Sequence, residues 1–336
     1  MVTDLLKMKV LITGITGQDG SYLAQSLLAD GLEVHGVVRQ SSLVQRSRLD
    51  SLPDLAKARS EGRLKLHYAD LVDSSSIQAV VRLVKPDYLY HLAGQNHVQI
   101  SYGLPEYTAQ TTGLGTLRIL EALRQEVPQC RLFLAATSEI FGDALENPQK
   151  ETTPSNPRNP YAAAKLYALN LVQIYRSAYG LFTCAGILFN HESPRRGENY
   201  VTRKIARGAA RIARGREREL VLGSLAPKRD WSFAPDIVRG MRLIAEAPSP
   251  SEYVLASGES HSVEEFCRLA FSIVGLDYRD YVRCDPAYMR PNEILETRGD
   301  SSKAREELGW RPEIKFVELV RIMVDSELAS LDKADK

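Results

Sequence analysis

A glycine-rich turn between an apolar segment and an amphipathic segment constrains the fold of this chain more than any other feature. Residues 9–13 (KVLIT) are apolar and rich in β-branched side chains, which predicts a buried strand. The turn that follows has the pattern GxxGxxG, and residues 21–30 then place leucines at helical spacing. This order predicts a dinucleotide site, because the N–H groups at the helix N-terminus can receive a pyrophosphate. The three glycines are Gly14, Gly17 and Gly20.

The alternation of strands and helices continues to about residue 189 and then becomes irregular. Strands separated by helices need crossover connections, so the pattern predicts a Rossmann-like, doubly wound parallel sheet of the α/β class. We expect a cofactor domain over residues 1–189, to which segments at about 223–256 return, and a smaller α/β substrate lobe over 190–336. Further strands are predicted at 33–38, 65–68, 87–92, 130–135 and 183–188, and helices at 74–85, 113–125, 160–179, 263–274 and 316–328.

Composition excludes several other classes of protein. The chain has 336 residues with 43 Lys and Arg against 42 Asp and Glu, and this balance argues against a general nucleic-acid or membrane-surface binder. No segment reaches the ~18 consecutive apolar residues of a membrane helix, and the first residues do not resemble a signal peptide. The four cysteines form no CxxC pair, so we expect reduced cysteines, no metal site and a cytoplasmic location.

The residue after the second predicted strand bears on which dinucleotide binds. An NAD-binding chain places an acidic side chain there to hold the ribose 2′-hydroxyl, but this chain has Arg39. An arginine favours a 2′-phosphate and therefore NADP, although a solvated loop arginine would look the same in sequence. Asp70, after the third strand, is a candidate contact to the adenine, and residues 92–95 after the fourth strand are expected to pass beneath the cofactor.

Four residues form a candidate catalytic set. Tyr161 and Lys165 are spaced i, i+4 at the start of a predicted helix, which puts both side chains on one face. The ammonium, together with a positively charged nicotinamide, can lower the tyrosine pKa so that its phenolate accepts a proton from a sugar or alcohol hydroxyl. Thr137 follows the fifth strand, at an edge where open α/β sheets bind their ligands, and can hydrogen-bond the same hydroxyl.

The fourth member, Glu139, is the informative one. Simple alcohol oxidation does not require a carboxylate beside the tyrosine, whereas loss of water β to a ketone needs a second proton transfer. One glutamate can remove the acidic α-proton and then protonate the departing hydroxyl. A helix-cap or ion-pair role for Glu139 is the alternative interpretation.

Several longer segments resemble the GDP-mannose 4,6-dehydratase family of extended short-chain dehydrogenases/reductases. The resemblance extends from about residue 9 to residue 327. The segments NHESPRRG and KRDW are specific within this superfamily, whereas the glycine motif and YxxxK are common. The similar segments are residues 14–24, 137–142 (TSEIFG), 159–168 (NPYAAAKLYA), 187–205, 228–231, 253–266, 285–293 (DPAYMRPNE) and 308–312 (LGWRP).

The resemblance implies a redox-neutral lyase that converts GDP-mannose to GDP-4-dehydro-6-deoxy-mannose for deoxysugar biosynthesis. It implies a tightly held NADP that is regenerated in each turnover, with Tyr161 as base at the C4 hydroxyl and Glu139 acting at C5 and C6. The implied cofactor contacts are Gly14, Thr16, Gly17, Gln18, Asp19, Arg39, Asp70, Leu71, Leu92, Gln95, Tyr107, Lys165, His191 and Arg196. The implied GDP-sugar contacts are Asn96, Ser138, Asn190, Lys204, Arg229, Arg290 and Glu293.

Two departures from the family pattern leave alternatives open. The family segment after the fourth strand usually has a serine near the sugar where this chain has Asn96, so a GDP-manno-heptose, with one more carbon at C6, is an alternative substrate. The family's paired arginines after the second strand are reduced to Arg39 and Gln40. That loop reaches a neighbouring subunit in the family, so the implied homo-oligomer is either a dimer or a tetramer.

Other functions remain as alternatives. A nucleotide-sugar epimerase would share Thr137, Tyr161 and Lys165, but Glu139 argues against it. A non-catalytic NADP-sensing module would have no need of all four residues. The basic run at residues 203–218 is interpreted as a solvated helix face, with Lys204 excepted.

Overall fold

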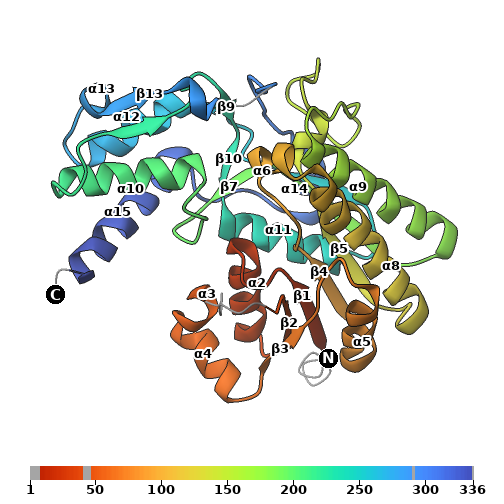
Figure 1. The fold of residues 1–336 in the computed structure, drawn as a ribbon. Helices are drawn as coiled ribbons and strands as arrows, with labels where there is room; N and C mark the ends of the chain where they lie inside the picture. The colour runs from red at the N-terminus through yellow and green to blue at the C-terminus, as the bar shows by residue number, and fades with distance from the viewer. Residues whose placement is uncertain (1–7, 41–46, 290–291, 335–336) are drawn as a thin grey trace.

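Among the residues that the structure describes, seven parallel strands form the central sheet. The computed structural model describes residues 8–40, 47–289 and 292–334 (Figure 1). The strand order is β11-β6-β5-β4-β1-β2-β3, and every neighbouring pair is parallel. This confirms the predicted Rossmann-like sheet. The strands are β1 (Lys9–Thr13), β2 (Glu33–Val38), β3 (Leu64–Tyr68), β4 (Tyr88–His91), β5 (Arg131–Ala135), β6 (Thr183–Leu188) and β11 (Glu252–Leu255).

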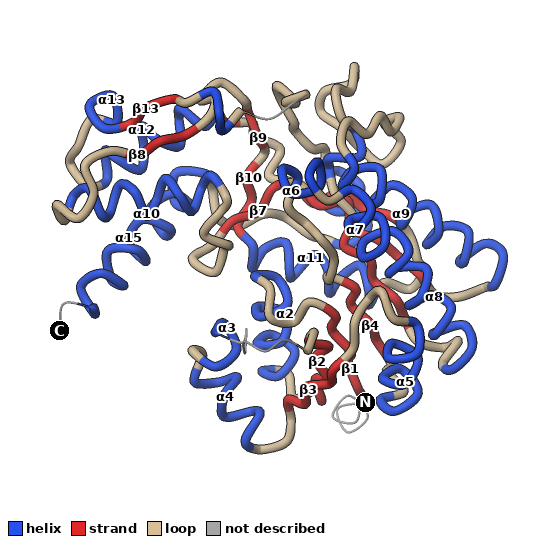
Figure 2. The backbone as a smooth tube through the Cα atoms, in the orientation of Figure 1, coloured by secondary structure: helices blue, strands red, loops and turns tan. Residues whose placement is uncertain are grey.

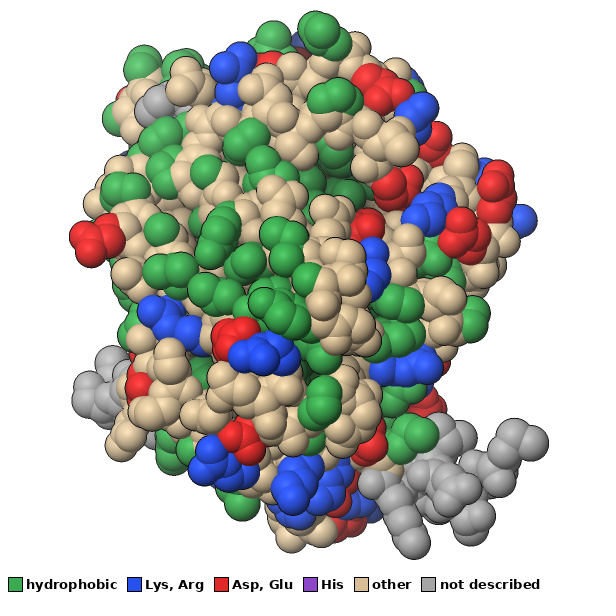
Figure 3. All heavy atoms as spheres, turned by 90° about the vertical axis from the view of Figure 1, so that its right-hand side faces the viewer, with side chains coloured by type: hydrophobic (Ala, Val, Ile, Leu, Met, Phe, Trp, Pro, Cys, Tyr) green, Lys and Arg blue, Asp and Glu red, His purple; other side chains and the backbone are tan. Residues whose placement is uncertain are grey.

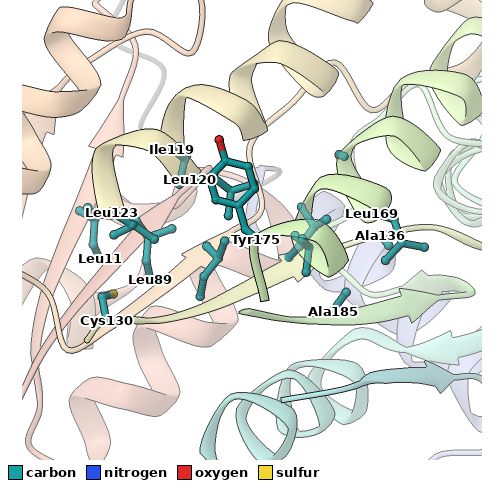
Figure 4. Packing of buried hydrophobic residues seen from close by; sticks show 14 of the residues in the cluster. Leu11, Leu89, Ile119, Leu120, Leu123, Cys130, Ala136, Leu169, Tyr175 and Ala185 are labelled. Carbon is teal, nitrogen blue, oxygen red and sulfur yellow. The ribbon is translucent and has the colours of Figure 1, made fainter. Parts of the chain in front are cut away.

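Helices cover both faces of this sheet. On one face α5 (Ser74–Val84), α8 (Leu114–Glu126) and α9 (Pro160–Tyr179) pack over alternate strand residues such as Leu11 and Leu89 (Figure 4). On the other face α2 (Gln18–Ala29) and α11 (Ala234–Glu246) pack over Val10 and Ile12. The strands are buried on both faces, which is why the sequence reads as nearly continuous apolar runs there.

A smaller lobe lies beside the sheet, at the upper left of Figure 1. Its core is formed by α10 (Val201–Ala213), α12 (Val263–Ile273) and α15 (Phe316–Ala334), together with the parallel pair β8 (Leu220–Leu222) and β13 (Val282–Cys284). The solvated face expected for the basic run at 203–218 is confirmed for Arg214, Arg216 and Arg218, which are exposed, and is wrong for Arg203. Ile205 and Ala209 are buried in this core, and the Arg203 guanidinium pairs with the Glu327 carboxylate.

The later part of the chain passes between the sheet and the lobe more than once. Residues 234–255 supply α11 and the edge strand β11 to the central sheet. Two small pairings involve segments outside the central sheet: β7 (Asn190–Glu192) with β10 (Trp231–Phe233), and β9 (Lys228–Arg229) with β12 (His261–Ser262). Figure 2 shows β7, β9 and β10 between the two regions. The division into two domains stays a prediction.

The remaining elements are short. The sequence analysis assigned no helix at α11, although its 13 residues bury one apolar face. It also assigned none of the short helices, whose three to eight residues give little periodicity. No helix within the described ranges is long and apolar enough to cross a bilayer. The elements are α3 (Ser47–Asp50), α4 (Pro53–Ser60), α6 (Val98–Gly103), α7 (Pro105–Thr108), η1 (Ala109–Gly113), η2 (Ser138–Phe141), α13 (Tyr278–Tyr281), η3 (Pro286–Tyr288) and α14 (Ser302–Leu308).

The close packing of α2 on the glycine turn generates a stability prediction. A methyl group at Gly20 would lie 2.3 Å from the Gly14 carbonyl oxygen and 2.6 Å from the Ile15 Cα. We expect Gly20→Ala to lower the free energy of unfolding by about 1–3 kcal/mol in urea denaturation. Gly103→Ala is the matched control, because nothing lies within 4 Å of its added methyl group. A Gly20→Ala variant as stable as this control would contradict the packing argument.

Candidate active site

A cavity of about 840 Å³, counted with its opening to solvent, lies at the carboxyl ends of β4, β5 and β6. It brings together all four predicted catalytic residues. Thr137 and Glu139 come from the segment after β5, and Tyr161 and Lys165 from the first turns of α9. The predicted substrate contacts Asn96, Ser138 and Asn190 and the predicted cofactor contacts Asp19, Leu92, His191 and Arg196 line the same cavity.

Tyr161 and Lys165 are almost completely buried on one face of α9. The Lys165 ammonium donates to the Ala135 carbonyl oxygen at 2.7 Å and lies 5.9 Å from the Tyr161 ring centroid. Burial lowers the pKa of Lys165 to about 8. Burial also raises the pKa of Tyr161, although a hydrogen bond with Thr137 acts in the opposite direction. Without a bound cofactor, burial therefore raises the pKa of Tyr161 more than its neighbours lower it, whereas the residue pattern had predicted a lowered pKa.

Glu139 lies in the first turn of η2, and its carboxylate is held by a neutral amide. The Asn159 Nδ2 donates to Glu139 Oε2 at 3.0 Å, while Asn159 Oδ1 accepts from the Ala162 N–H at 2.8 Å and so caps α9. Thr137 Oγ1 accepts from the Glu139 N–H at 3.3 Å. Within the described part of the chain the Glu139 carboxylate forms no ion pair, and the cap of η2 is Thr137, so the structure supports neither a helix-cap nor an ion-pair role for Glu139.

The glycine turn presents an uncapped helix terminus. Gly14 has φ +76°, and an added Cβ there would lie 2.8 Å from the Ala93 nitrogen, so only glycine fits. The N-cap of α2 is Gly17, which has no capping side chain. The first N–H groups of α2 are thus available to an anion, as a pyrophosphate requires. The Thr16 carbonyl oxygen accepts from Arg48 Nη1 at 3.2 Å.

The two residues that begin α2 are tied to β7. Asp19 Oδ2 lies 2.9 Å from His191 Nε2, and Gln18 Nε2 donates to the His191 carbonyl oxygen at 3.1 Å. Burial would raise the pKa of Asp19, but the charge and hydrogen bond of His191 outweigh it and lower that pKa. These three predicted cofactor contacts therefore form one buried network that joins the glycine turn to the wall of the cavity.

The predicted contacts at the far end of the cofactor site lie on the ends of β2, β3 and β4. Arg39 Nη1 donates to the Tyr107 hydroxyl at 2.8 Å, which joins two predicted contacts. Asp70 Oδ1 accepts from the Val72 N–H, and Leu71 packs in the core beside Gly115. An uncapped helix N-terminus and an exposed arginine after β2 suit a dinucleotide with a 2′-phosphate, so the residues present fit NADP.

A second cavity, of about 1100 Å³ with its opening to solvent, adjoins the first. It contains the predicted nucleotide contacts Asn190, Lys204, Arg229 and Glu293. The structure pairs two of them, because Arg229 Nη2 donates to Glu293 Oε1 at 2.5 Å. Arg229 Nη1 donates to the Ile294 carbonyl oxygen at 2.8 Å. The prediction for Arg290 lies outside the described residues.

Four residues line both cavities: His97, Asn190, Arg196 and Tyr200. The Arg196 guanidinium lies 3.7 Å from the centroid of the Tyr200 ring, and the Tyr200 hydroxyl donates to the Asn96 carbonyl oxygen at 3.4 Å. The two cavities thus meet at a polar junction. A ligand with a sugar at one end and a nucleotide at the other would have its charged linker there.

Sequence reasoning missed several residues of this site. Gln95, whose cofactor contact stays a prediction, also has a local role that the sequence did not show: its amide accepts from the His97 N–H at 2.7 Å and donates to the His97 carbonyl oxygen at 3.0 Å. Its side chain thus supports His97 at the junction. Nothing in the sequence marks His97 or Tyr200, whereas Asn159 immediately before a Pro-initiated helix is a recognisable cap signal.

Comparisons with known proteins show which family this chain is similar to. A family profile described as GDP-mannose 4,6 dehydratase matches residues 11–323. GDP-mannose 4,6 dehydratase 2 of Arabidopsis thaliana is 48% identical over 97% of this chain and 88% of that protein. GDP-mannose 4,6 dehydratase of Homo sapiens is 46% identical over 95% of this chain and 91% of that protein.

A solved structure extends the comparison. The dTDP-glucose 4,6-dehydratase DesIV from Streptomyces venezuelae, with NAD and TYD bound, superimposes with a TM-score of 0.82 at 25% identity. The match covers 94% of this chain and 96% of that one.

Burial of Lys165 generates a pH prediction. The pKa of Lys165 is lowered to about 8, below its ordinary value in the unfolded chain, so folding is penalised while the ammonium is charged. From about pH 8 to the ordinary lysine pKa the unfolded chain binds more protons than the folded chain, so this penalty is relieved as pH rises. We expect the stability of the wild type relative to Lys165→Met to rise over this window by up to about 3 kcal/mol. Urea denaturation of the two cofactor-free proteins measures it, and parallel pH curves would contradict the assignment.

Proposed function

The chain belongs to the GDP-mannose 4,6-dehydratase family, and we propose that it removes water from GDP-mannose with a tightly held NADP to give GDP-4-dehydro-6-deoxy-mannose. Family membership makes the protein a hydro-lyase of nucleotide-sugar metabolism that uses a nicotinamide cofactor. The observation that carries the finer proposal is the cavity where Thr137, Glu139, Tyr161 and Lys165 meet.

We assign the cofactor to the glycine turn and the ends of the neighbouring strands. When bound there, NADP would supply the hydride chemistry of the reaction, in which the hydride taken from C4 of the sugar is returned to C6, so no cofactor would be consumed. The N-terminus of α2 holds the pyrophosphate, and Arg39 holds the 2′-phosphate. The remaining contacts are Asp70, Leu71, Leu92, Gln95, Tyr107, His191 and Arg196.

Tyr161 takes the proton of the C4 hydroxyl, and Thr137 hydrogen-bonds the same oxygen. Burial raises the pKa of Tyr161, so its ionised form needs a cation close by. Lys165 has a pKa of about 8, so at neutral pH most of it is the ammonium that supports the phenolate. The lysine is thus an electrostatic partner held in position by the Ala135 carbonyl oxygen.

Glu139 completes the elimination. A ketone at C4 makes the C5 proton acidic, and the Glu139 carboxylate removes it. The same group then gives this proton to the C6 hydroxyl, the C6–O bond breaks, and water leaves. One carboxyl group thereby serves as base and acid in turn, and the proton removed from C5 leaves in the water. When hydride returns to C6, C5 must regain a proton, and the proton that Tyr161 took from the C4 hydroxyl balances this step and restores the phenolate.

The nucleotide occupies the second cavity. Lys204 and Arg229 supply cations for the diphosphate, as does Arg290, which lies outside the described residues. Asn190 lies at the junction, and Glu293 pairs with Arg229 in the chain without ligand. The sugar then projects past Arg196 toward Ser138 and Tyr161.

Asn96 supports a second candidate substrate. It lines the catalytic cavity, and its Nδ2 donates to the Leu92 carbonyl oxygen at 3.4 Å. A GDP-manno-heptose carries one additional carbon at C6 and would undergo the same reaction. A nucleotide-sugar epimerase is disfavoured, because it has no use for Glu139.

We propose that the enzyme is a cytoplasmic homo-oligomer, a dimer or a tetramer. Figure 3 shows hydrophobic side chains gathered on the face where α8 and α9 lie. On α9, Tyr167, Ile174 and Tyr179 are 43%, 51% and 53% exposed. An apolar face of this kind favours burial against a second copy. All four cysteines are free, which is consistent with a reducing compartment.

Product analysis tests the reaction. We expect the purified wild type to convert GDP-mannose to a product that lacks the C6 hydroxyl, as seen by NMR and by a mass loss of one water. A product that keeps this hydroxyl would exclude the dehydratase. If the enzyme instead turned over the GDP-manno-heptose faster than GDP-mannose, the heptose nucleotide would be its substrate.

A Glu139→Gln variant separates the two halves of the reaction. The amide cannot accept the C5 proton, so we expect water loss to fall by about 10²-fold or more. Oxidation at C4 uses Tyr161 and Lys165, so reduced nicotinamide is still expected to form on the enzyme. Stopped-flow absorbance measures this signal. Its absence, with GDP binding intact, would contradict the assigned roles.

A further inference from the structure

The side-chain amide of Asn159 makes two hydrogen bonds at once, and each serves a different part of the site. Its Oδ1 accepts from the Ala162 N–H at 2.8 Å, and its Nδ2 donates to Glu139 Oε2 at 3.0 Å. Asn159 is 8% exposed. The residue therefore joins the start of α9 directly to the carboxylate of η2.

Helix capping alone does not explain an asparagine at this position. The helix begins with Pro160, and an N-cap oxygen satisfies a backbone N–H of its first turn. Serine, threonine or aspartate would cap as well, since each supplies the same acceptor. None of these side chains carries an N–H group beside the capping oxygen. The contact to Glu139 is what distinguishes asparagine from the other good caps.

A neutral donor suits a carboxylate that must both take up and release a proton. A lysine or arginine in contact with Glu139 would favour its ionised form strongly and weaken it as a base. An amide N–H holds the carboxylate oxygen in place with a smaller effect on basicity. Oε2 can accept this hydrogen bond in both protonation states, provided that the proton binds at Oε1.

The same asparagine sets the relative position of two reacting groups. Tyr161 lies two residues after Asn159, in the first turn of the helix that Asn159 caps. Under the proposed function Tyr161 acts at the C4 hydroxyl and Glu139 at the adjacent C5. A rigid link between the two residues keeps their separation matched to two neighbouring atoms of one sugar.

We propose that Asn159 is a positioning residue, which holds Glu139 Oε2 so that Oε1 faces C5 and C6 of the substrate. This inference rests on the proposed function. Asn159 itself exchanges no proton. Its contribution is to hold the carboxylate in the orientation that proton removal at C5 and delivery at C6 require.

Two substitutions separate positioning from capping. Asn159→Ser keeps an N-cap oxygen but removes the Nδ2 group that donates to Glu139. Asn159→Asp keeps the shape and the cap but replaces the donor with a second carboxylate. For Asn159→Ser in the NADP-loaded protein we expect kcat for dehydration to fall by about 10- to 100-fold, with KM for GDP-mannose, GDP affinity and melting temperature unchanged. Asn159→Asp should lose more, because two carboxylates then face each other.

Isotope and absorbance measurements test the positioning role directly, because a purely structural role of Asn159 would leave both results unchanged. If C5 proton removal is slowed, GDP-mannose deuterated at C5 should show a larger isotope effect on kcat in Asn159→Ser than in the wild type. Reduced nicotinamide should also accumulate at steady state, because oxidation at C4 remains fast. Asn159→Ala, which lacks both hydrogen bonds, should show the same kinetic defect with a lower melting temperature.

The outcomes separate this inference from the proposed function. A wild type that does not dehydrate GDP-mannose refutes the proposed function itself. An active wild type, with Asn159→Ser retaining wild-type kcat and isotope effect, overturns the positioning role alone. A loss of kcat accompanied by equal changes in KM and melting temperature also overturns it, because capping would then account for the effect.

Discussion

The common direction of the central strands is the constraint on which the rest of the site depends. Strands β1, β4, β5 and β6 are parallel, so all of them end at the same edge of the sheet. Gly14 follows the first of these strands, Asn96 the second, Glu139 the third and Asn190 the fourth. Residues far apart in the sequence meet because each chain segment leaves the sheet at the same edge. The start of α9 then brings Tyr161 and Lys165 to this edge.

Burial at that edge has an electrostatic cost. Lys165 is 3% exposed, and its pKa is lowered to about 8, so the charged ammonium opposes folding. Tyr161 is also buried, and its pKa is raised. Groups of this kind stabilise a folded chain poorly, and their presence together in one cavity indicates that the cavity serves chemistry. Asp19 and His191 avoid the same cost by pairing with each other.

Much of this arrangement could be predicted from local sequence. Apolar runs of β-branched residues predicted the strands, and the i, i+4 spacing predicted that Tyr161 and Lys165 share one face of a helix. Their meeting with Glu139 followed from the rule that parallel strands present ligand-binding residues at one edge. Pairings between distant polar side chains were not predictable. Arg229 and Glu293 were both expected on the substrate, and nothing in their positions showed that they would bond to each other.

The sequence by itself determined the class of fold, the family and the set of reactive groups. The fold class depends on periodicity and glycine spacing, the reactive groups on residue type, and the family on its resemblance in longer segments such as NHESPRRG and KRDW; all are local properties of the chain. The tertiary structure alone decided that Gln95 supports His97, that two cavities share a junction at Arg196, and that Asn159 holds Glu139. Each of these relations joins side chains whose distance is set by the packing of separate elements. A hydrogen bond depends on tenths of an ångström, and sequence spacing carries that information only within a single helix or turn.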